Sequence, residues 1–262
     1  MSSTASTRAT PIDEFAGLRV LVTGGASGIG HAVTTAALAR GASVAVLDLD
    51  PATAPTGAVR VAGDVTDDVS VAAAVEQVAG ALGGLDVLVN NAGIGAQGNV
   101  EANSLDEWRR VFEVNVLGMV RATRAALPHL RRSPHAAVVN MCSIAATAGL
   151  PDRALYSASK GAVLSLTLAM AADHLHEGIR VNCVNPGTTD TPWIDRLLDQ
   201  ATDPAAERAA LEARQPSGRL VTPQEVAAAV LHLAGPSAGG TTGTSVAVDG
   251  GMAGLRLRPR TA

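Results

Sequence analysis

Short apolar runs alternate with longer alanine-rich stretches along nearly the whole chain, and this alternation limits the possible folds more than any other feature. The short runs are apolar at successive positions, which is typical of strands buried on both faces. The longer stretches have the length and composition of helices. Strands are expected at 19–22, 43–47, 59–62, 86–90, 137–141, 180–184 and 245–248, and helices at 28–40, 68–82, 105–130, 154–176 and 223–233, with a further helical region at 192–214.

Buried strands separated by helices predict an α/β fold, a doubly wound (Rossmann) seven-stranded parallel sheet with helices on both faces. Hydrophobic residues make up 47% of the 262 residues and aromatic residues only 2%, so Ala, Val and Leu must form the core. No linker interrupts residues 18–249. We therefore expect one domain at 15–252, between a flexible N-terminal tail (1–14) and a C-terminal tail (253–262).

Charge and cysteine content argue against several classes of protein. The net charge is −4 and no basic run is long, which disfavours nucleic-acid binding. Cys142 and Cys183 each lie in an apolar run and are expected to be buried free thiols, with no disulfide framework and no metal site. The first 14 residues lack the apolar segment of a secretory signal, and no membrane span free of glycine and charge is evident. A cytoplasmic protein is expected.

The distinctive motifs all follow the ends of predicted strands. Ligands of a doubly wound sheet bind outside the carboxyl ends of its strands, so this agreement locates the expected site. The segments concerned are 23–30, 48, 64–65, 91–93, 142–143 and 185–191.

The first of these motifs is a glycine-rich turn between a strand and a helix. Its glycines allow the backbone to approach a pyrophosphate, whose charge the helix N-terminus favours. Asp48 ends the second strand, 24 positions after Gly24, and can accept both ribose hydroxyls of an adenosine. It would repel a 2′-phosphate, and Leu49 supplies no countercharge, so NAD is favoured over NADP. The turn residues proposed to bind the cofactor are Gly24, Ser27, Gly28, Ile29 and Gly30.

Two further segments are expected to contact the cofactor. The Asp64 carboxylate can meet the adenine amino group beside Val65, although a turn aspartate is a common alternative. The small residues of Asn91-Ala92-Gly93 let the backbone lie against the cofactor. Asn90 is expected to have a structural role, pinning neighbouring strands.

The only tyrosine of the chain, Tyr156, stands four residues before its only lysine, Lys160. The other 19 of the 20 basic residues are arginine, so Lys160 occupies a position where arginine would not serve. Residues i and i+4 share a helix face. An ammonium beside a phenol favours the phenolate and lowers the phenol pKa, which suits proton transfer near neutral pH.

These motifs together resemble the short-chain dehydrogenase/reductase family, from about Gly17 to Gly251: TGGASGIG at 23–30, NNAG at 90–93, Asn115, Ser143, YSASK at 156–160 and PG at 186–187. The resemblance implies that Tyr156 is the general acid/base, that Lys160 binds the nicotinamide ribose, and that Ser143 holds the substrate oxygen. It also implies that Asn115 anchors a water leading to Lys160. Pro186, Gly187 and Thr188 would close over the nicotinamide carboxamide, and Thr191 would reach a phosphate.

The segment 189–219 is the expected substrate lid, because loops at this edge carry specificity. Trp193 can cover a ligand there, although a core position is a common alternative. Arg153 and Arg214 can grip a carboxylate, and the alternative for each is a plain surface position. The segments 186–192 and 214–219 resemble one branch of the family, which includes the 2-keto-3-deoxy-L-fuconate dehydrogenases and the cytosolic type-2 3-hydroxybutyrate dehydrogenase. This branch implies a small hydroxy acid or sugar acid as substrate.

The sequence thus predicts an NAD-dependent oxidoreductase that interconverts a secondary alcohol and a ketone. The alternatives are an NADPH-dependent 3-oxoacyl reductase, a hydrophobic alcohol or steroid dehydrogenase, and a non-enzymatic nucleotide-sensing protein. Asp48 argues against the first, and Ser143, Tyr156 and Lys160 argue against the last. By analogy with the family, a homotetramer is expected.

Overall fold

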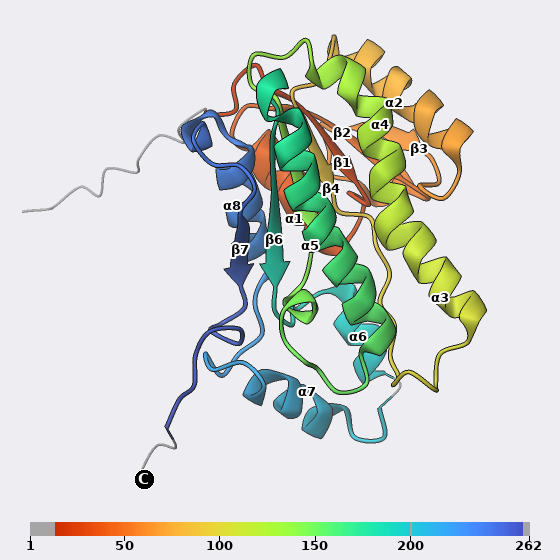
Figure 1. Cartoon of the computed structure of the whole chain (residues 1–262), viewed down its shortest axis with the longest axis vertical. Helices are drawn as coiled ribbons and strands as arrows, with labels where there is room; N and C mark the ends of the chain where they lie inside the picture. The colour runs from red at the N-terminus through yellow and green to blue at the C-terminus, as the bar shows by residue number, and fades with distance from the viewer. Residues whose placement is uncertain (1–13, 200, 259–262) are drawn as a thin grey trace, which may run out of the picture.

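A single parallel sheet of seven strands forms the centre of the protein (Figure 1). The computed structural model describes residues 14–199 and 201–258. The strand order is β3-β2-β1-β4-β5-β6-β7, and every neighbouring pair is parallel, which confirms the predicted fold. The strands are β1 (Arg19–Thr23), β2 (Ser43–Asp48), β3 (Val59–Ala62), β4 (Val87–Asn90), β5 (Ala137–Met141), β6 (Arg180–Pro186) and β7 (Ser245–Val248).

Helices cover both faces of the sheet. Alternate residues of β1 explain how the layers form, since Val20 and Val22 pack toward one face and Leu21 toward the other. The first face is covered by α1 and α8, and the second by α2, α4 and α5 (Figure 1). The helices of the two layers are α1 (Gly28–Leu38), α2 (Asp68–Leu82), α3 (Leu105–Phe112), α4 (Gly118–Leu130), α5 (Ala154–His174) and α8 (Pro223–Ala234).

The helix expected at 105–130 is interrupted in the middle. A π-helical segment, η2 (Glu113–Leu117), separates α3 from α4 and contains Asn115. Single π turns of this kind occur often at functional sites. On either side of it, α3 and α4 continue in nearly the same direction (Figure 1). Short 3₁₀ turns occur at η1 (Pro51–Thr53), η3 (Ile144–Ala146), η4 (Leu175–Glu177) and η5 (Pro236–Ala238).

Buried amide and hydroxyl side chains join four neighbouring elements beneath the site. Nδ2 of Asn90 donates to Oγ1 of Thr123 (3.0 Å) and to Oδ1 of Asn140 (2.9 Å). Nδ2 of Asn140 donates in turn to Oγ1 of Thr167 (3.0 Å). These bonds tie β4 and β5 to α4 and α5, which is the structural role expected of Asn90.

The helical region expected at 192–214 consists of two helices, α6 (Pro192–Leu198) and α7 (Pro204–Ala213). Both lie beyond the carboxyl ends of β6 and β7, whose arrowheads point toward them in Figure 1. A β-bridge between Thr189 and Val221 joins the two ends of this excursion. The segment therefore leaves the sheet and returns to it at one place, as expected of a lid.

The limits of the domain differ slightly from the expected ones. Residues 1–13 and 259–262, which make up most of the two expected tails, lie outside the described residues. Glu14 was assigned to the N-terminal tail, but its Oε1 accepts a hydrogen bond from Oγ of Ser237 (2.6 Å). Phe15 beside it is fully buried. The folded part therefore begins at least one residue earlier than expected.

One stretch of the described residues, Ala154–Glu177, is long and apolar enough to cross a membrane by length and composition. It contains Lys160 and Gly161, and it corresponds to α5 with the following turn η4. In the structure α5 packs on β6 and on the π segment. Only 39% of its most apolar window is buried, so a substantial apolar face remains uncovered within one chain.

Candidate active site

One cavity of about 650 Å³ lies at the carboxyl edge of the sheet and brings together most of the residues singled out from the sequence. Two of those residues do not line it: Gly30 and Asn115 lie behind its wall. The expected residues that line it are Gly24, Ser27, Gly28, Ile29, Asp48, Asp64, Val65, Asn91, Ala92, Gly93, Ser143, Arg153, Tyr156, Lys160, Pro186, Gly187, Thr188, Thr191, Trp193 and Arg214.

The glycine-rich turn leaves no room for side chains at two positions. A β-carbon at Gly24 would come within 2.9 Å of Cα of Ala92, and one at Gly30 would overlap the carbonyl oxygen of Gly24. Gly30 thus acts by letting α1 approach the turn, although it does not line the cavity. Gly28 has a φ of +53°, which also favours glycine. The result is a bare backbone cradle at the N-terminus of α1, which fits a pyrophosphate.

Asp48 ends β2 with its carboxylate held at the rim of the cradle. The N–H of Ala26 in the glycine-rich turn donates to Oδ2 of Asp48 (3.0 Å). Leu49 beside it is 73% exposed and also lines the cavity. Among the described residues that line this end of the cavity, from Leu47 to Thr66, none is basic. This environment suits two free ribose hydroxyls and offers no cation for a 2′-phosphate.

Asp64 and Asn91 follow the ends of β3 and β4 and line the cavity beside the cradle. Oδ1 of Asp64 accepts hydrogen bonds from the N–H and the hydroxyl of Thr66 (both 2.8 Å), and these bonds lower the pKa of its carboxyl group. Nδ2 of Asn91 donates to the carbonyl oxygens of Thr23 (3.0 Å) and Gly24 (2.9 Å). Asn91 therefore fixes the turn while its backbone lines the cavity, and a tightly hydrogen-bonded carboxylate remains available at Asp64.

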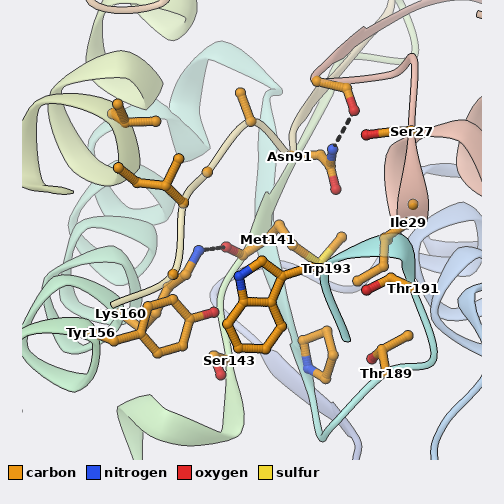
Figure 2. Close-up of a pocket in the computed structure, with 18 of the residues that line it drawn as sticks. Ser27, Ile29, Asn91, Met141, Ser143, Tyr156, Lys160, Thr189, Thr191 and Trp193 are labelled. Atoms are coloured by element: carbon orange, nitrogen blue, oxygen red, sulfur yellow. Dashed lines mark hydrogen bonds between the residues drawn. The ribbon is translucent and has the colours of Figure 1, made fainter. Parts of the chain in front are cut away.

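Tyr156 and Lys160 lie on one face of α5, as their spacing predicts, and both line the cavity (Figure 2). The Lys160 ammonium lies 5.7 Å from the centroid of the Tyr156 ring. It is only 4% exposed, and its Nζ donates to the carbonyl oxygen of Met141 (2.8 Å), at the end of β5. The lysine thus ties the helix to the sheet edge while keeping a positive charge beside the phenol.

Ser143 stands directly after β5, where the chain turns into the 3₁₀ segment η3. Its Oγ accepts a hydrogen bond from the N–H of Ala145 (3.1 Å), so the hydroxyl hydrogen is left to donate elsewhere. Figure 2 shows the hydroxyl groups of Ser143 and Tyr156 directed into the same part of the cavity. Two hydroxyl groups facing one space can hold a single substrate oxygen between them.

Asn115 is fully buried in the π segment and bonds to two other segments. Its Nδ2 donates to the carbonyl oxygen of Ile94 (2.9 Å) and to Oγ of Ser159 (3.1 Å), and its Oδ1 accepts from the N–H of Ile94 (2.8 Å). Both amide hydrogens are therefore used within the chain. The side chain fixes the loop after β4 to α5, on the turn that carries Tyr156, and the π segment lets it point inward from a helical stretch.

The lid lies against two other segments of the cavity, the loop after β4 and the cradle. Trp193, at the start of α6, lies against the backbone of Gly95, where an added β-carbon would come within 2.9 Å of the indole. Thr191 lies opposite Gly28, with its Cγ2 3.6 Å from where a β-carbon would stand. Figure 2 shows the Trp193 indole directed into the cavity, as expected of a residue that covers a ligand.

The segment after β6 is held in place from outside the cavity. Pro186, Gly187 and Thr188 line the cavity, and a β-carbon at Gly187 would come within 2.9 Å of Cα of Asp249. Nε2 of the buried Gln215 donates to the carbonyl oxygen of Thr188 (3.1 Å). Gln215 is a positioning residue that the sequence analysis missed, because nothing in its local pattern marks it as buried.

Arg153 and Arg214 line the cavity from two different elements. Arg153 is the N-cap residue of α5 and Arg214 the C-cap residue of α7. Burial, and then the like charge of Arg214, lower the pKa of Arg153. Neither guanidinium forms an ion pair with a described residue, and the one side-chain bond of Arg153 goes to the carbonyl oxygen of Asp152 (2.8 Å). Two unpaired cations facing one space form an anion site.

Several other residues that line the cavity were not foreseen. Arg196 on α6 adds a third guanidinium at the lid. The remaining ones are mostly apolar and offer no local signal, since their sequence neighbourhoods look like ordinary core segments. The main examples are Ile94, Ala96, Val114, Leu150, Leu197 and Leu211.

Cys142 and Cys183 are buried free thiols, as expected. The hydrogen bond with Cys183 and burial raise the pKa of the Cys142 thiol, so it stays uncharged. Its Sγ lies 3.2 Å from the carbonyl oxygen of Lys160. Within residues 14–199 and 201–258, no three His, Cys, Asp or Glu side chains are arranged to hold a metal ion.

The fold and this site are those of a dinucleotide-dependent dehydrogenase. Residues 24–253 match the family model described as enoyl-(acyl carrier protein) reductase, and the chain belongs to the short-chain dehydrogenase/reductase family. It is an oxidoreductase of the class acting on CH–OH groups. This result confirms the predicted family and reaction class.

Named relatives cover most of the chain. A 2-(S)-hydroxypropyl-CoM dehydrogenase of Xanthobacter autotrophicus is 40% identical, over 89% of this chain and 95% of the relative. The cis-4-hydroxycyclohexanecarboxylate dehydrogenase of Sinomonas cyclohexanicum is 41% identical (91% and 98%). A 2-keto-3-deoxy-L-fuconate dehydrogenase of Xanthomonas campestris pv. campestris is 36% identical (95% and 84%), as the expected branch implies.

A solved structure confirms the fold. The ligand-free aldohexose dehydrogenase of Thermoplasma acidophilum superposes with a TM-score of 0.88 at 33% identity. The match covers 97% of this chain and 100% of the other.

Proposed function

We propose that this protein oxidises the hydroxyl group of a small anionic secondary alcohol to a ketone, or reduces the ketone, with NAD(H) as cofactor. The observation that carries this proposal is the arrangement of Tyr156, Lys160 and Ser143 at one end of the cavity that begins at the glycine cradle. A bound nicotinamide dinucleotide supplies the hydride acceptor. The bare backbone at Gly24, together with Asp48 at the rim, fits such a cofactor.

Three side chains would divide the chemistry. Ser143 donates its free hydroxyl hydrogen to the substrate oxygen and so orients the carbon that carries it. Tyr156 takes the hydroxyl proton during oxidation and returns it during reduction. Lys160 keeps its charge beside the phenol and is held there by the carbonyl group of Met141. Asn115 is a positioning residue, because it fixes the loop before the site and the helix that carries Tyr156.

The preference for NAD over NADP rests on Asp48. Its carboxylate is held by the glycine-rich turn and faces a part of the cavity without a basic residue among those described. A 2′-phosphate there would meet a like charge with no compensating cation. This arrangement disfavours an NADPH-dependent 3-oxoacyl reductase, which was the first alternative.

An anionic substrate is supported by Arg153 and Arg214. They line the cavity, they belong to different elements, and neither is neutralised by a described carboxylate. A hydrophobic alcohol or steroid would leave both guanidinium groups without a partner in the closed site. We therefore prefer a hydroxy acid to that second alternative.

We further propose that the protein is a homotetramer assembled through α4 and α5. The support is the uncovered apolar face of α5, where Leu168 is 51% exposed. A β-carbon at Gly161 on the same helix would meet no atom within 4 Å, so this face is open to another chain. The two free thiols support a location in the reducing cytoplasm. Light scattering and cell fractionation test these two proposals.

Turnover is the direct test of the reaction. Purified protein is incubated with NAD and a panel of hydroxy acids, and NADH formation is followed by absorbance. We expect turnover that Tyr156→Phe abolishes while NADH binding, measured by calorimetry, persists. NADH binding without turnover of any secondary alcohol or ketone would instead support a nucleotide-sensing protein.

A further inference from the structure

The two ends of the cavity, one for the cofactor and one for the substrate, are lined by different kinds of polar side chains. The carboxylate and amide side chains that line it, Asp48, Asp64 and Asn91, all belong to the ends of β2, β3 and β4. Among the described residues, no carboxylate, amide or imidazole side chain lines the part formed by the lid, η3 and the start of α5. The polar groups of that part are hydroxyl groups and arginines.

Apolar side chains supply most of the remaining substrate wall. Leu150 lies in the loop before α5, Trp193 and Leu197 on α6, and Leu211 on α7. Leu211 is 2% exposed and belongs to a small hydrophobic cluster within the lid. Hydroxyl groups of a polyhydroxylated substrate would lose their water hydrogen bonds against such a wall, which is costly without new partners.

The hydroxyl and guanidinium groups of this cavity have different points of attachment. Ser143 follows the end of β5 and Tyr156 lies in the first turn of α5, whereas Arg153 precedes α5 as its N-cap residue. Arg214 comes from the lid, at the end of α7. The two guanidinium groups therefore enter from the start of α5 and from the lid, and the apolar side chains line the same cavity.

Resting on the proposed function, we infer that the substrate is a secondary alcohol whose hydroxyl-bearing carbon is joined through an apolar skeleton to a remote carboxylate or similar oxyanion. The carbon–hydrogen bond at that carbon gives its electron pair to NAD⁺ as hydride, and the hydroxyl proton passes to Tyr156. A ketone with the same skeleton and anion results. Sugar acids and 2-hydroxy acids are poor substrates, the first because of their hydroxyl groups and the second because the anion adjoins the reacting carbon.

A matched set of substrates tests this inference. NADH formation is compared for cis- and trans-4-hydroxycyclohexanecarboxylate, the methyl ester of each, gluconate and lactate. We expect kcat/KM for the better hydroxycyclohexane acid to exceed that for each of the other compounds at least about ten-fold, which corresponds to about 1.4 kcal/mol. Equal or faster turnover of gluconate or lactate would overturn the inference while leaving the dehydrogenase activity established.

A binding measurement separates this inference from the reaction itself. Calorimetry on the protein saturated with NADH compares the dissociation constants of cyclohexanecarboxylate and gluconate. Neither titration needs turnover. Preferential binding of cyclohexanecarboxylate that Arg153→Ala weakens about ten-fold or more supports the inference even if no alcohol is oxidised. Equal binding of gluconate contradicts it.

A pair of variants tests the apolar wall. Leu150 is half-buried and lines the cavity, whereas Leu105 on α3 is 71% exposed and does not. Leu150→Asn should lower kcat/KM for the hydroxycyclohexane acid about ten-fold, with less loss for gluconate. Leu105→Asn should change neither value. An equal loss for both substrates in Leu150→Asn would mean that the leucine does not contact an apolar skeleton.

Discussion

The Lys160 ammonium donates a 2.8 Å hydrogen bond to the carbonyl oxygen of Met141, the last residue of β5 and two residues before Ser143. This bond joins the helix that carries Tyr156 to the strand end that leads into Ser143. The relative placement of the two hydroxyl groups that face the substrate therefore depends on a lysine that is almost completely buried.

Lys160→Arg should lower kcat at least about a hundred-fold, although the charge is retained. A planar guanidinium is broader than an ammonium and cannot fit the same buried space beside Met141 without displacing α5. Steady-state turnover and thermal unfolding, measured together, check this prediction. Near-full activity of the variant would show that a compact cation is not required at residue 160.

Asp48→Asn should weaken NAD(H) binding about ten-fold to a hundred-fold and improve NADP(H) binding relative to it. The variant loses the charged acceptor of the ribose hydroxyls, a difference of roughly 1.5–3 kcal/mol, and removes the repulsion of a 2′-phosphate. Asp50→Asn is the control, because Asp50 caps η1 and does not line the cavity. The ratio of kcat/KM for the two cofactors is the measurement, and a wild-type ratio favouring NADP would refute the proposal directly.

Arg153→Ala should lower kcat/KM for an anionic substrate about ten-fold to a hundred-fold and have little effect on the neutral ester. Arg214→Ala should act in the same direction. Arg131→Ala is a suitable control, since Arg131 pairs with Glu177 and does not line the cavity. Equal losses for acid and ester would place the anion elsewhere.

The folded state should become less stable in acid, because the Asp86 carboxylate becomes protonated. Burial alone would raise the pKa of this carboxyl group, but hydrogen bonds from Arg19 and Ser133 outweigh burial and lower it. A carboxyl group with a lowered pKa stabilises the folded state fully above its unfolded pKa of about 3.9. That stabilisation is lost as the pH falls through the folded value. Wild-type thermal unfolding should therefore show a drop in midpoint below about pH 4.

Asp86→Asn should unfold several degrees lower at neutral pH, because charged hydrogen bonds to a buried carboxylate contribute roughly 1.5–3 kcal/mol. Its midpoint should also depend less on acidity. Asp106→Asn serves as the control, since the Asp106 side chain is 90% exposed in its ion pair with Arg109. If both variants lowered the unfolding midpoint equally, the buried pair of Arg19 and Asp86 would stabilise the fold no more than an exposed ion pair does.

Leu168→Glu should dissociate the proposed tetramer, because it places a charge in an apolar contact between copies of α5. Light scattering coupled to size exclusion measures the mass. Val69→Glu is the control, since Val69 on α2 is 77% exposed and belongs to neither α4 nor α5. An unchanged mass for Leu168→Glu would exclude this face as the interface.

The sheet and the cofactor cradle were predictable because both have local signatures. A strand buried on two faces, such as β4, is continuously apolar, and the turn around Gly24 requires glycine because of its close contact with Ala92. The placement of Tyr156 and Lys160 on one helix face was also predictable, since it follows from their spacing alone.

Other features depend on contacts between distant parts of the chain. The π segment around Asn115 forms because its side chain bonds to Ile94 and Ser159, which lie 21 and 44 positions away. The buried state of Gln215 follows from its bonds to the backbone at Thr188 and Arg219. The apolar wall of Leu150 and Leu211 arises only when the lid folds over the loop before α5. No local pattern encodes such relationships.

The bridge between Thr189 and Val221 means that the whole lid is one uninterrupted insertion. Its apolar side chains, Ile194, Leu211 and Leu220, pack among themselves and form a hydrophobic cluster separate from those of the sheet. The lid's share of the selectivity for the alcohol, including Trp193 and Arg214, is therefore encoded in one continuous stretch of the gene. Exchanging that stretch with a relative's should alter substrate preference while leaving the proton-transfer residues and the nucleotide cradle untouched.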